Sequence, residues 1–98
     1  MTTVFNLKNQ PVIKINKNTI EHISGKIIGY FDHKAIKNND MQEIAKISKG
    51  HILNAFTNER IASIMSNNIL NINNQIIGKV VGQCEKEKTA AAAAFIMF

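Results

Sequence analysis

The sequence has few of the residues that crosslink or interrupt a small fold. It contains one cysteine, one proline and no tryptophan among 98 residues. A single thiol cannot form an intramolecular disulfide, which favours a reducing compartment, and we expect Cys84 to be a small buried apolar side chain. Because Pro11 is the only proline, little interrupts regular structure after the first dozen residues.

Arginine is almost absent, although the chain is basic. Eleven lysines and Arg60, set against seven acidic residues, give a formal net charge of +5. A positive balance favours nucleic acid as a partner. However, guanidinium groups suit phosphates and base edges better than ammonium groups do, and the lysines are dispersed without a run of five or six. Composition therefore leaves nucleic-acid binding as an alternative.

Motifs for catalysis, metal binding and nucleotide binding are also lacking. Zinc sites usually contain closely spaced pairs of ligands, but His22, His33 and His51 lie eleven and eighteen residues apart. The Gly-Lys pairs at 25–26 and 78–79 lack the spacer and the following Ser or Thr of a phosphate-binding loop. The sequence therefore predicts no enzymatic activity, no metal and no cofactor.

No long hydrophobic run is present. The longest, AAAAAFIMF at residues 90–98, is far shorter than the roughly 20 residues that cross a bilayer as a helix. The N-terminus does not combine a basic start with an apolar block, as a signal peptide would. We therefore expect no membrane span and a cytoplasmic location, in the producing cell or in a host that it enters.

The first sixteen residues favour β structure. Stretches rich in β-branched and other apolar residues flank the turn signal Asn9-Gln10-Pro11. We expect residues 1–16 to form a β-hairpin or an extended β arm, which needs something to pack on.

The rest of the chain shows apolar residues at intervals of three and four, which is typical of helices. These intervals occur in four stretches: 20–31, 41–56, 61–65 and 69–98. We therefore predict a single mostly helical α+β domain over residues 1–98, with three to four helices after the β element. The alternative is a mixed α/β fold in which residues 25–31 and 76–84 are strands, since Ile-Ile and Val-Val pairs favour a pleated surface.

A five-residue phrase occurs twice, as GKIIG at 25–29 and as GKVVG at 78–82. In helices, small residues four apart let two backbones approach closely. The hypothesis is that both segments form helical contacts in a protein interface. Chance in a biased composition is the alternative, and duplication has little support because the match ends outside the phrase. The predicted interface glycines are Gly25, Gly29, Gly78 and Gly82.

A degenerate helix-turn-helix can be placed over residues 61–79. Ile61-Ala62, the turn-prone stretch at 66–68 and the apolar Ile72 fit its spacing loosely, whereas Asn67 and Gln75 depart from it. Its second helix would present amides that suit adenine in the major groove. The predicted nucleic-acid contacts are Asn71, Asn73, Asn74, Gln75 and Lys79.

The C-terminal segment 89–98 is predicted to be an apolar helix or tail. The side chains of Phe95, Ile96, Met97 and Phe98 cannot all face one core from one helix, so we expect some of them to contact a partner. The alternative is that the tail closes over its own core.

Together these observations predict a small non-enzymatic protein-binding module, such as an adaptor, an inhibitor or a regulatory subunit. It would act through helical, partly apolar surfaces on a protein partner that the sequence does not identify, and it would form a homodimer or higher oligomer. The alternative is a DNA-binding transcriptional regulator that uses residues 61–79.

Overall fold

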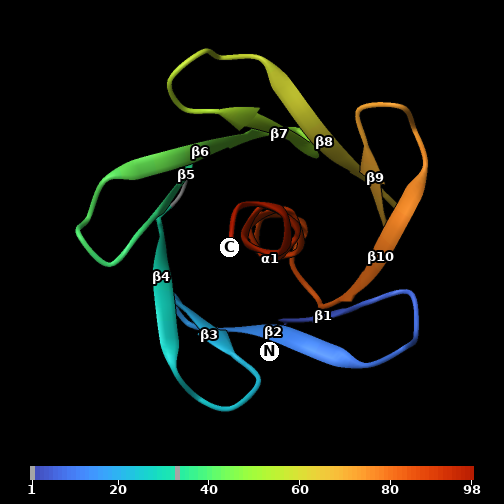
Figure 1. The fold of residues 1–98 in the computed structure, drawn as a ribbon, viewed down its shortest axis with the longest axis horizontal. Helices are drawn as coiled ribbons and strands as arrows, with labels where there is room; N and C mark the ends of the chain where they lie inside the picture. The colour runs from blue at the N-terminus through green and yellow to red at the C-terminus, as the bar shows by residue number, and fades with distance from the viewer. Residues whose placement is uncertain (1, 33) are drawn as a thin grey trace.

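The computed structural model describes residues 2–32 and 34–98. In these residues ten strands and one helix are formed: β1 (Thr2–Phe5), β2 (Pro11–Asn16), β3 (Thr19–His22), β4 (Ile27–Asp32), β5 (Ala35–Lys37), β6 (Glu43–Ser48), β7 (His51–Asn54), β8 (Arg60–Met65), β9 (Asn68–Asn71), β10 (Ile76–Val81) and α1 (Glu85–Met97). The strands form a closed antiparallel barrel in which consecutive strands pair and β1 closes against β10. The helix lies inside the ring of strands (Figure 1).

The barrel consists of five hairpins that spread outward from the helix (Figure 1). We number them 1 to 5 in chain order: β1–β2, β3–β4, β5–β6, β7–β8 and β9–β10. Each pairs a short strand with a longer one through a tip loop, and we call the end of the barrel that carries these five loops the tip end. The short turns between hairpins, together with the entry into α1, form the opposite end, the turn end.

The tip loops share one local structure at intervals of 16 or 17 residues. In hairpin 1 the Asn6 N–H donates to the Gln10 carbonyl at 2.9 Å and the Asn9 N–H donates to the Asn6 carbonyl at 2.9 Å. The equivalent first residues of the five loops are Asn6, His22, Asn38, Asn54 and Asn71. A residue with left-handed φ precedes the return strand in each loop: Asn9, Gly25, Met41, Asn58 and Asn74. A turn followed by one left-handed residue is a common connection of β-hairpins.

The buried residues that line the inside of the barrel recur at the same interval of 16 or 17 residues. Five apolar residues at equivalent places on the short strands are each 0% exposed: Val4, Ile20, Ile36, Ile52 and Ile69. On the long strands β2, β4 and β6, buried residues alternate with less buried ones. Alternation with a period of two, on residues that are largely β-branched, favours strands that bury one face. Barrel closure then pairs every strand edge.

Helix α1 forms the axis of the core. Thr89 and the five alanines at 90–94 are all buried. Alanine has the highest helix propensity, and its small side chain lets the helix pack inside a ring of strands that is already lined with isoleucine. A helix that is apolar on all sides is typical of a buried position, and the hairpins supply the burial here.

The predicted mostly helical α+β fold is therefore wrong, and so is the expectation that the chain acts through helical surfaces, because the described residues form a closed barrel with a single helix inside it. Residues 1–16 do contain a hairpin, β1–β2, but it is the first of five rather than an appendage to helices. The mixed α/β alternative predicts strands at residues 25–31 and 76–84, and these ranges overlap β4 and β10. The surrounding fold is nevertheless a closed β-barrel around one helix in the described residues.

The apparent helical spacing has a physical cause. Ile20, Ile23 and Ile27 lie on β3, on the tip loop and on β4 respectively. The interval of three or four residues between them counts across a loop rather than around a helix. Short strands joined by short loops can therefore imitate the period of a helix.

Candidate functional site

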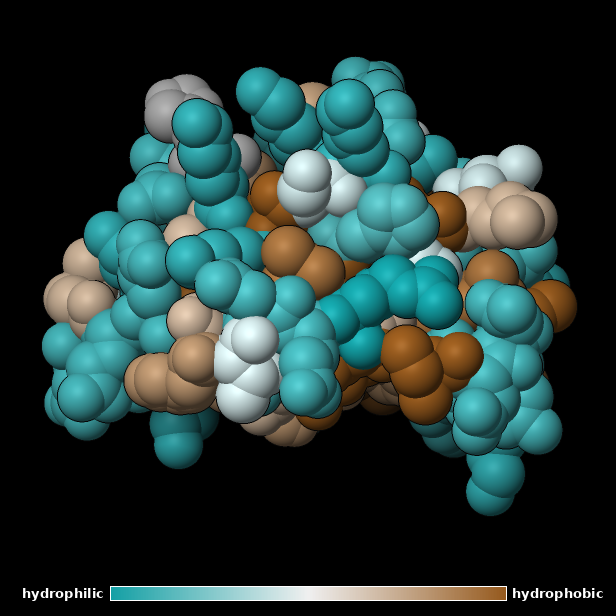
Figure 2. All heavy atoms as spheres, turned by 90° about the horizontal axis from the view of Figure 1, so that it is seen from above, coloured by the Kyte–Doolittle hydropathy of each residue, from teal (hydrophilic) through white to brown (hydrophobic). Residues whose placement is uncertain are grey.

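The tip end exposes apolar side chains. Leu7, Ile23 and Ile72 each directly follow the first residue of their tip loop, and Phe56 lies in a tip loop that is one residue longer. Leu7 is 68% and Phe56 is 77% exposed, and Met41 of hairpin 3 is 57% exposed. In a side view hydrophilic residues cover most of the surface and hydrophobic ones emerge in separate patches (Figure 2). The tip loops thus present a ring of apolar groups that the core does not require.

The C-terminal residues reach the tip end from inside the barrel. Phe95 lies against Gly78 of β10 and Phe98 against Gly29 of β4, where a Cβ atom would come within 3.1 Å and 2.8 Å of the respective rings. The two glycines are equivalent positions of hairpins 5 and 2. Their missing side chains leave room for the two aromatic rings and for the carbonyl oxygens of Lys37 and Phe5, which a Cβ atom on Gly29 and Gly78 would approach to 2.6 Å and 3.0 Å respectively.

The predicted interface in the tail thus divides into two parts. Phe95, Ile96 and Met97 are partly buried against the barrel core, whereas Phe98 is 43% exposed. Three of the four residues pack on their own domain, as the alternative for the tail described. Phe98 is the one that remains available at the tip end.

The glycine hypothesis needs correction, because the described residues form one helix and the glycines lie outside it. Gly25 has φ of +100° in the tip loop of hairpin 2 and has open space around its Cα. A Cβ on Gly82 would collide with the side chain of Thr2. Gly25 therefore lies in a loop, and Gly82 allows β1 to approach closely. Gly29 and Gly78 lie against phenylalanine rings, so the four glycines do not form helix–helix contacts.

The helix-turn-helix hypothesis is also wrong, because residues 61–79 form β8, β9 and most of β10. The amides assigned to base contacts build the tip loop of hairpin 5. Asn71 Nδ2 donates to Gln75 Oε1 at 2.9 Å, and the backbone N–H groups of Asn73 and Gln75 donate to Asn71 Oδ1. Asn74 supplies the left-handed residue at φ 62°, and Lys79 lies exposed on β10. DNA binding stays a prediction without the motif that suggested it.

A small hollow opens at the tip end beside the end of α1. It has a volume of about 300 Å³. Its lining comes from hairpins 1 and 2 and the helix end: Val12, Ile13, His22, Ile28, Phe95 and Phe98. The hollow is almost wholly apolar, which suits an apolar side chain of a partner better than a polar substrate.

The turn end has a different character. A wider open cavity of about 740 Å³ lies between hairpin 3, β7 and the start of α1, and it extends from the turn end along β6 as far as Glu43. Its charged lining residues are Lys34, Lys46, Lys49, Lys86, Glu43 and Glu85. Four lysines and two glutamates are mixed there, so the lining carries a small net positive charge that favours anions weakly.

Polar contacts tie the helix and the strands together at the turn end. The Thr2 hydroxyl donates to Glu87 at 2.9 Å, and Lys88 Nζ donates to Asn67 Oδ1 at 3.0 Å. The hydrogen bond from Lys37, whose ammonium lies 3.1 Å from the carboxylate, lowers the pKa of Asp32. These hydrogen bonds and this ion pair stabilise the fold.

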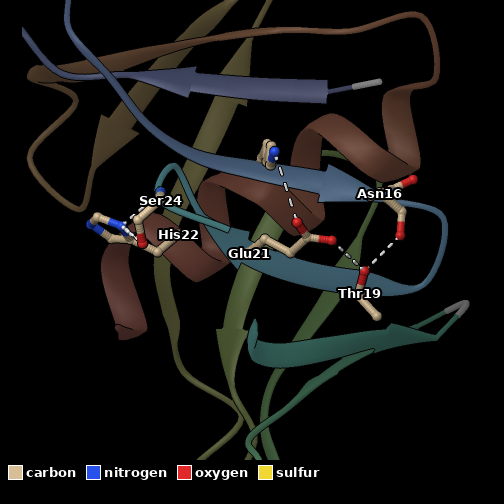
Figure 3. A network of polar contacts seen from close by, with 6 residues as sticks. Asn16, Thr19, Glu21, His22 and Ser24 are labelled. Atoms are coloured by element: carbon tan, nitrogen blue, oxygen red, sulfur yellow. Dashed lines mark hydrogen bonds and ion pairs between the residues drawn. The ribbon is translucent and has the colours of Figure 1, made fainter. Parts of the chain in front are cut away.

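A second polar network joins hairpins 1 and 2 (Figure 3). The Thr19 hydroxyl lies 2.7 Å from the Asn16 carbonyl and 3.0 Å from Glu21, whose carboxylate is 3.9 Å from Lys14 Nζ. These polar side chains bind one another across paired strands and leave no free acid–base pair among them.

The two described histidines, His22 and His51, lie on different hairpins. His22 Nδ1 lies 3.0 Å from the Ser24 hydroxyl in the tip loop of hairpin 2 (Figure 3), His51 is exposed on β7, and His33 lies outside the described residues. Over 2–32 and 34–98 no group of three or more His, Cys, Asp or Glu side chains is placed to hold a metal ion. In the same residues no helix has the length and apolarity needed to cross a membrane. Cys84, expected to be buried, is exposed.

The tip loops were missed as a site because the internal repeat was missed. The phrase GK(I/V)(I/V)G is out of step with the repeat: Ile27-Ile28-Gly29 corresponds to Ile76-Ile77-Gly78 in the structure, not to residues 80–82. The signal that could have revealed it was the recurrence of Asn or His at the loop starts together with the buried residues listed above.

Comparisons with known proteins identify this arrangement. A family model described as "5-fold beta-flower protein" matches residues 2–98, which is nearly the whole chain. No curated protein and no solved structure gives a significant match.

Proposed function

The chain belongs to the 5-fold beta-flower family, and we propose that it is a non-enzymatic protein-binding module whose binding face is the tip end. The observation that carries this proposal is the ring of exposed apolar side chains on the tip loops. Such a module would act as an adaptor, an inhibitor or a regulatory subunit.

Position argues that the ring has a role in binding. Hairpin loops are usually polar, and these loops are fixed by their own backbone and amide hydrogen bonds. That loop geometry does not need the side chains of Leu7, Ile23, Phe56 and Ile72. A polar residue at each of these positions would make the protein more soluble. A single exposed apolar residue needs no explanation, but repetition around one end of a barrel, with Phe98 inside the ring, favours an interface.

The closed barrel also limits how a partner can bind. In the described residues each strand is paired on both sides, so a partner cannot add a strand to an edge. Binding must use side chains. The tip end offers apolar anchors and a hollow of about 300 Å³, which correspond to the buried centre of a protein interface.

The test compares the two ends of the barrel. We expect Leu7→Ser combined with Phe56→Ser to abolish capture of the partner found by crosslinking in the native host, since burying each side chain contributes about 1.5–3 kcal/mol. In dilute protein that is monomeric, the melting temperature should stay nearly unchanged, because both residues are exposed in the single chain.

The matched control is Met65→Ser combined with Val81→Ser, which removes two exposed apolar side chains from the turn end. It should leave capture intact. Equal loss of capture in both double variants, or in neither, would remove the tip end as the binding face.

A further inference from the structure

We propose that the tip end binds a second copy of this chain, face to face about a two-fold axis, with hairpin 1 against hairpin 4, hairpin 2 against hairpin 3, and hairpin 5 against itself. This inference rests on the proposed function, because it uses the same face and names the partner. Two-fold dimers are the commonest protein oligomers. In such a dimer both chains use the same surface, so a contact from one residue to another occurs twice.

The charges at the tip end are unevenly divided among the hairpins. In the loops and the first residue of each return strand, hairpin 1 carries Lys8, hairpin 2 carries Lys26, and hairpin 3 carries Asp40 and Glu43. Hairpin 4 carries the neighbouring Glu59 and Arg60, and hairpin 5 carries no charge between Asn71 and Ile76. All six charged side chains are exposed. Adjacent hairpins 1 and 2 are therefore basic, hairpin 3 is acidic, and hairpins 4 and 5 are neutral overall.

Two-fold symmetry restricts how two such rings can meet. When one ring faces another, the order of the hairpins is reversed, so one hairpin meets itself and the other four meet in two reciprocal pairs. Five registers exist, one for each hairpin that meets itself. With hairpin 1, 2 or 3 on the axis, Lys8, Lys26 or the acidic pair faces its own copy. With hairpin 4 on the axis, basic hairpin 1 faces basic hairpin 2.

One register remains, with the uncharged hairpin 5 on the axis. It places Lys26 opposite Asp40 and Glu43, and Lys8 opposite the neutral pair Glu59 and Arg60, and each of these contacts occurs twice in the dimer. Like charges that face each other destabilise a wrong register by more free energy than an exposed ion pair contributes to the right one. The charges therefore chiefly select the register of the dimer.

The same register matches the apolar side chains. Leu7 of hairpin 1 faces Phe56 of hairpin 4, Ile23 of hairpin 2 faces Met41 of hairpin 3, and Ile72 faces its own copy. These residues are between 42% and 77% exposed in the single chain. Apolar contact supplies the affinity that exposed ion pairs lack.

The charge balance of the whole chain explains why the tip end would be the face that pairs. The formal net charge is +5, so two copies repel each other on average. The six tip-end charges listed above comprise three basic and three acidic residues, so this end is neutral. The excess positive charge lies on the rest of the surface.

Sedimentation equilibrium of charge variants at low salt tests the proposal. We expect the wild type to form a dimer of twice the 10.9 kDa chain mass. Lys26→Glu alone and Asp40→Lys/Glu43→Lys alone should each weaken the dimer by about tenfold or more, because each places like charges opposite one another twice. An equimolar mixture of these two variants should form a heterodimer, since both contacts between unlike chains are then attractive. The combined variant Lys26→Glu/Asp40→Lys/Glu43→Lys should dimerise like the wild type.

Lys86→Glu is the control, because it makes the same charge change at the exposed start of α1 and should leave the dimer unchanged. A monomeric wild type at millimolar concentration, or two charge variants that fail to form a dimer when mixed, would overturn the pairing. If the wild type is monomeric and Leu7→Ser/Phe56→Ser no longer captures another host protein, the proposed function is upheld and this inference is refuted. Intact capture would refute the proposed function.

Discussion

Replacing Ile36 with alanine should lower the free energy of unfolding by about 2–5 kcal/mol, the usual cost of removing a large aliphatic side chain from a core. Ile36 is 0% exposed and belongs to the set of five equivalent residues on the short strands. If the barrel is an internal repeat, Ile20→Ala and Ile52→Ala should cost similar amounts. Chemical denaturation of the three variants measures this.

Ile72→Ala is the matched control for these three variants. Ile72 is an isoleucine of the same chain, but it lies 51% exposed on the tip loop of hairpin 5. Its replacement should change stability by no more than about 0.5 kcal/mol. Equal effects at Ile36 and Ile72 would show that the set of five does not form the wall of a core.

The second large effect concerns the alanines of α1. Ala92→Leu should destabilise the protein by about 1–3 kcal/mol or prevent folding, because the added atoms have no space inside a closed ring of strands. Ala92 is 0% exposed in the middle of the buried helical segment. A thermal melt followed by circular dichroism detects the loss.

Ala55→Leu provides the comparison, since Ala55 lies partly exposed in the tip loop of hairpin 4 and has room for a larger side chain. It should melt close to the wild type. A stabilised Ala92→Leu would mean that the helix lies on a surface, where leucine adds apolar contact, rather than within the barrel.

Part of this architecture could be predicted from the sequence. The alanine run at 90–94 marks a helix through its intrinsic propensity, and α1 contains it. The turn signal before Pro11 marks the loop of β1–β2, because it combines a residue tolerant of left-handed φ with a residue that can begin a strand. Both features are local, so a short stretch of sequence carries enough information to specify them.

The closed barrel depends on contacts that no short stretch contains. Val4 and Ile69 are far apart in sequence, yet β1 and β9 both flank β10 in the ring. The strands are only three to six residues long, which is too short for a clear alternation, and their loops are short enough to imitate helical intervals. A comparison of positions 16 or 17 residues apart would have exposed the repeat.

The proposed binding face at the tip end could not be assembled from the sequence. An apolar C-terminus was expected to serve a partner, but Phe95 lies against Gly78 inside the barrel and leaves Phe98 as the exposed residue. Leu7, Ile23 and Phe56 appear as isolated apolar residues in sequence. They belong together only because the five hairpins bring their tip loops to one end.

The central claim is that α1 runs through the barrel and ends among the tip-end hairpins. Nuclear Overhauser measurements in solution test it most directly. We predict contacts from the Phe98 ring to the Gly29 α-protons and from the Phe95 ring to the Gly78 α-protons, since each glycine lies against the edge carbons of one ring. Phe95 and Phe98 rings that show contacts only within the helix would place α1 outside the barrel and contradict the account.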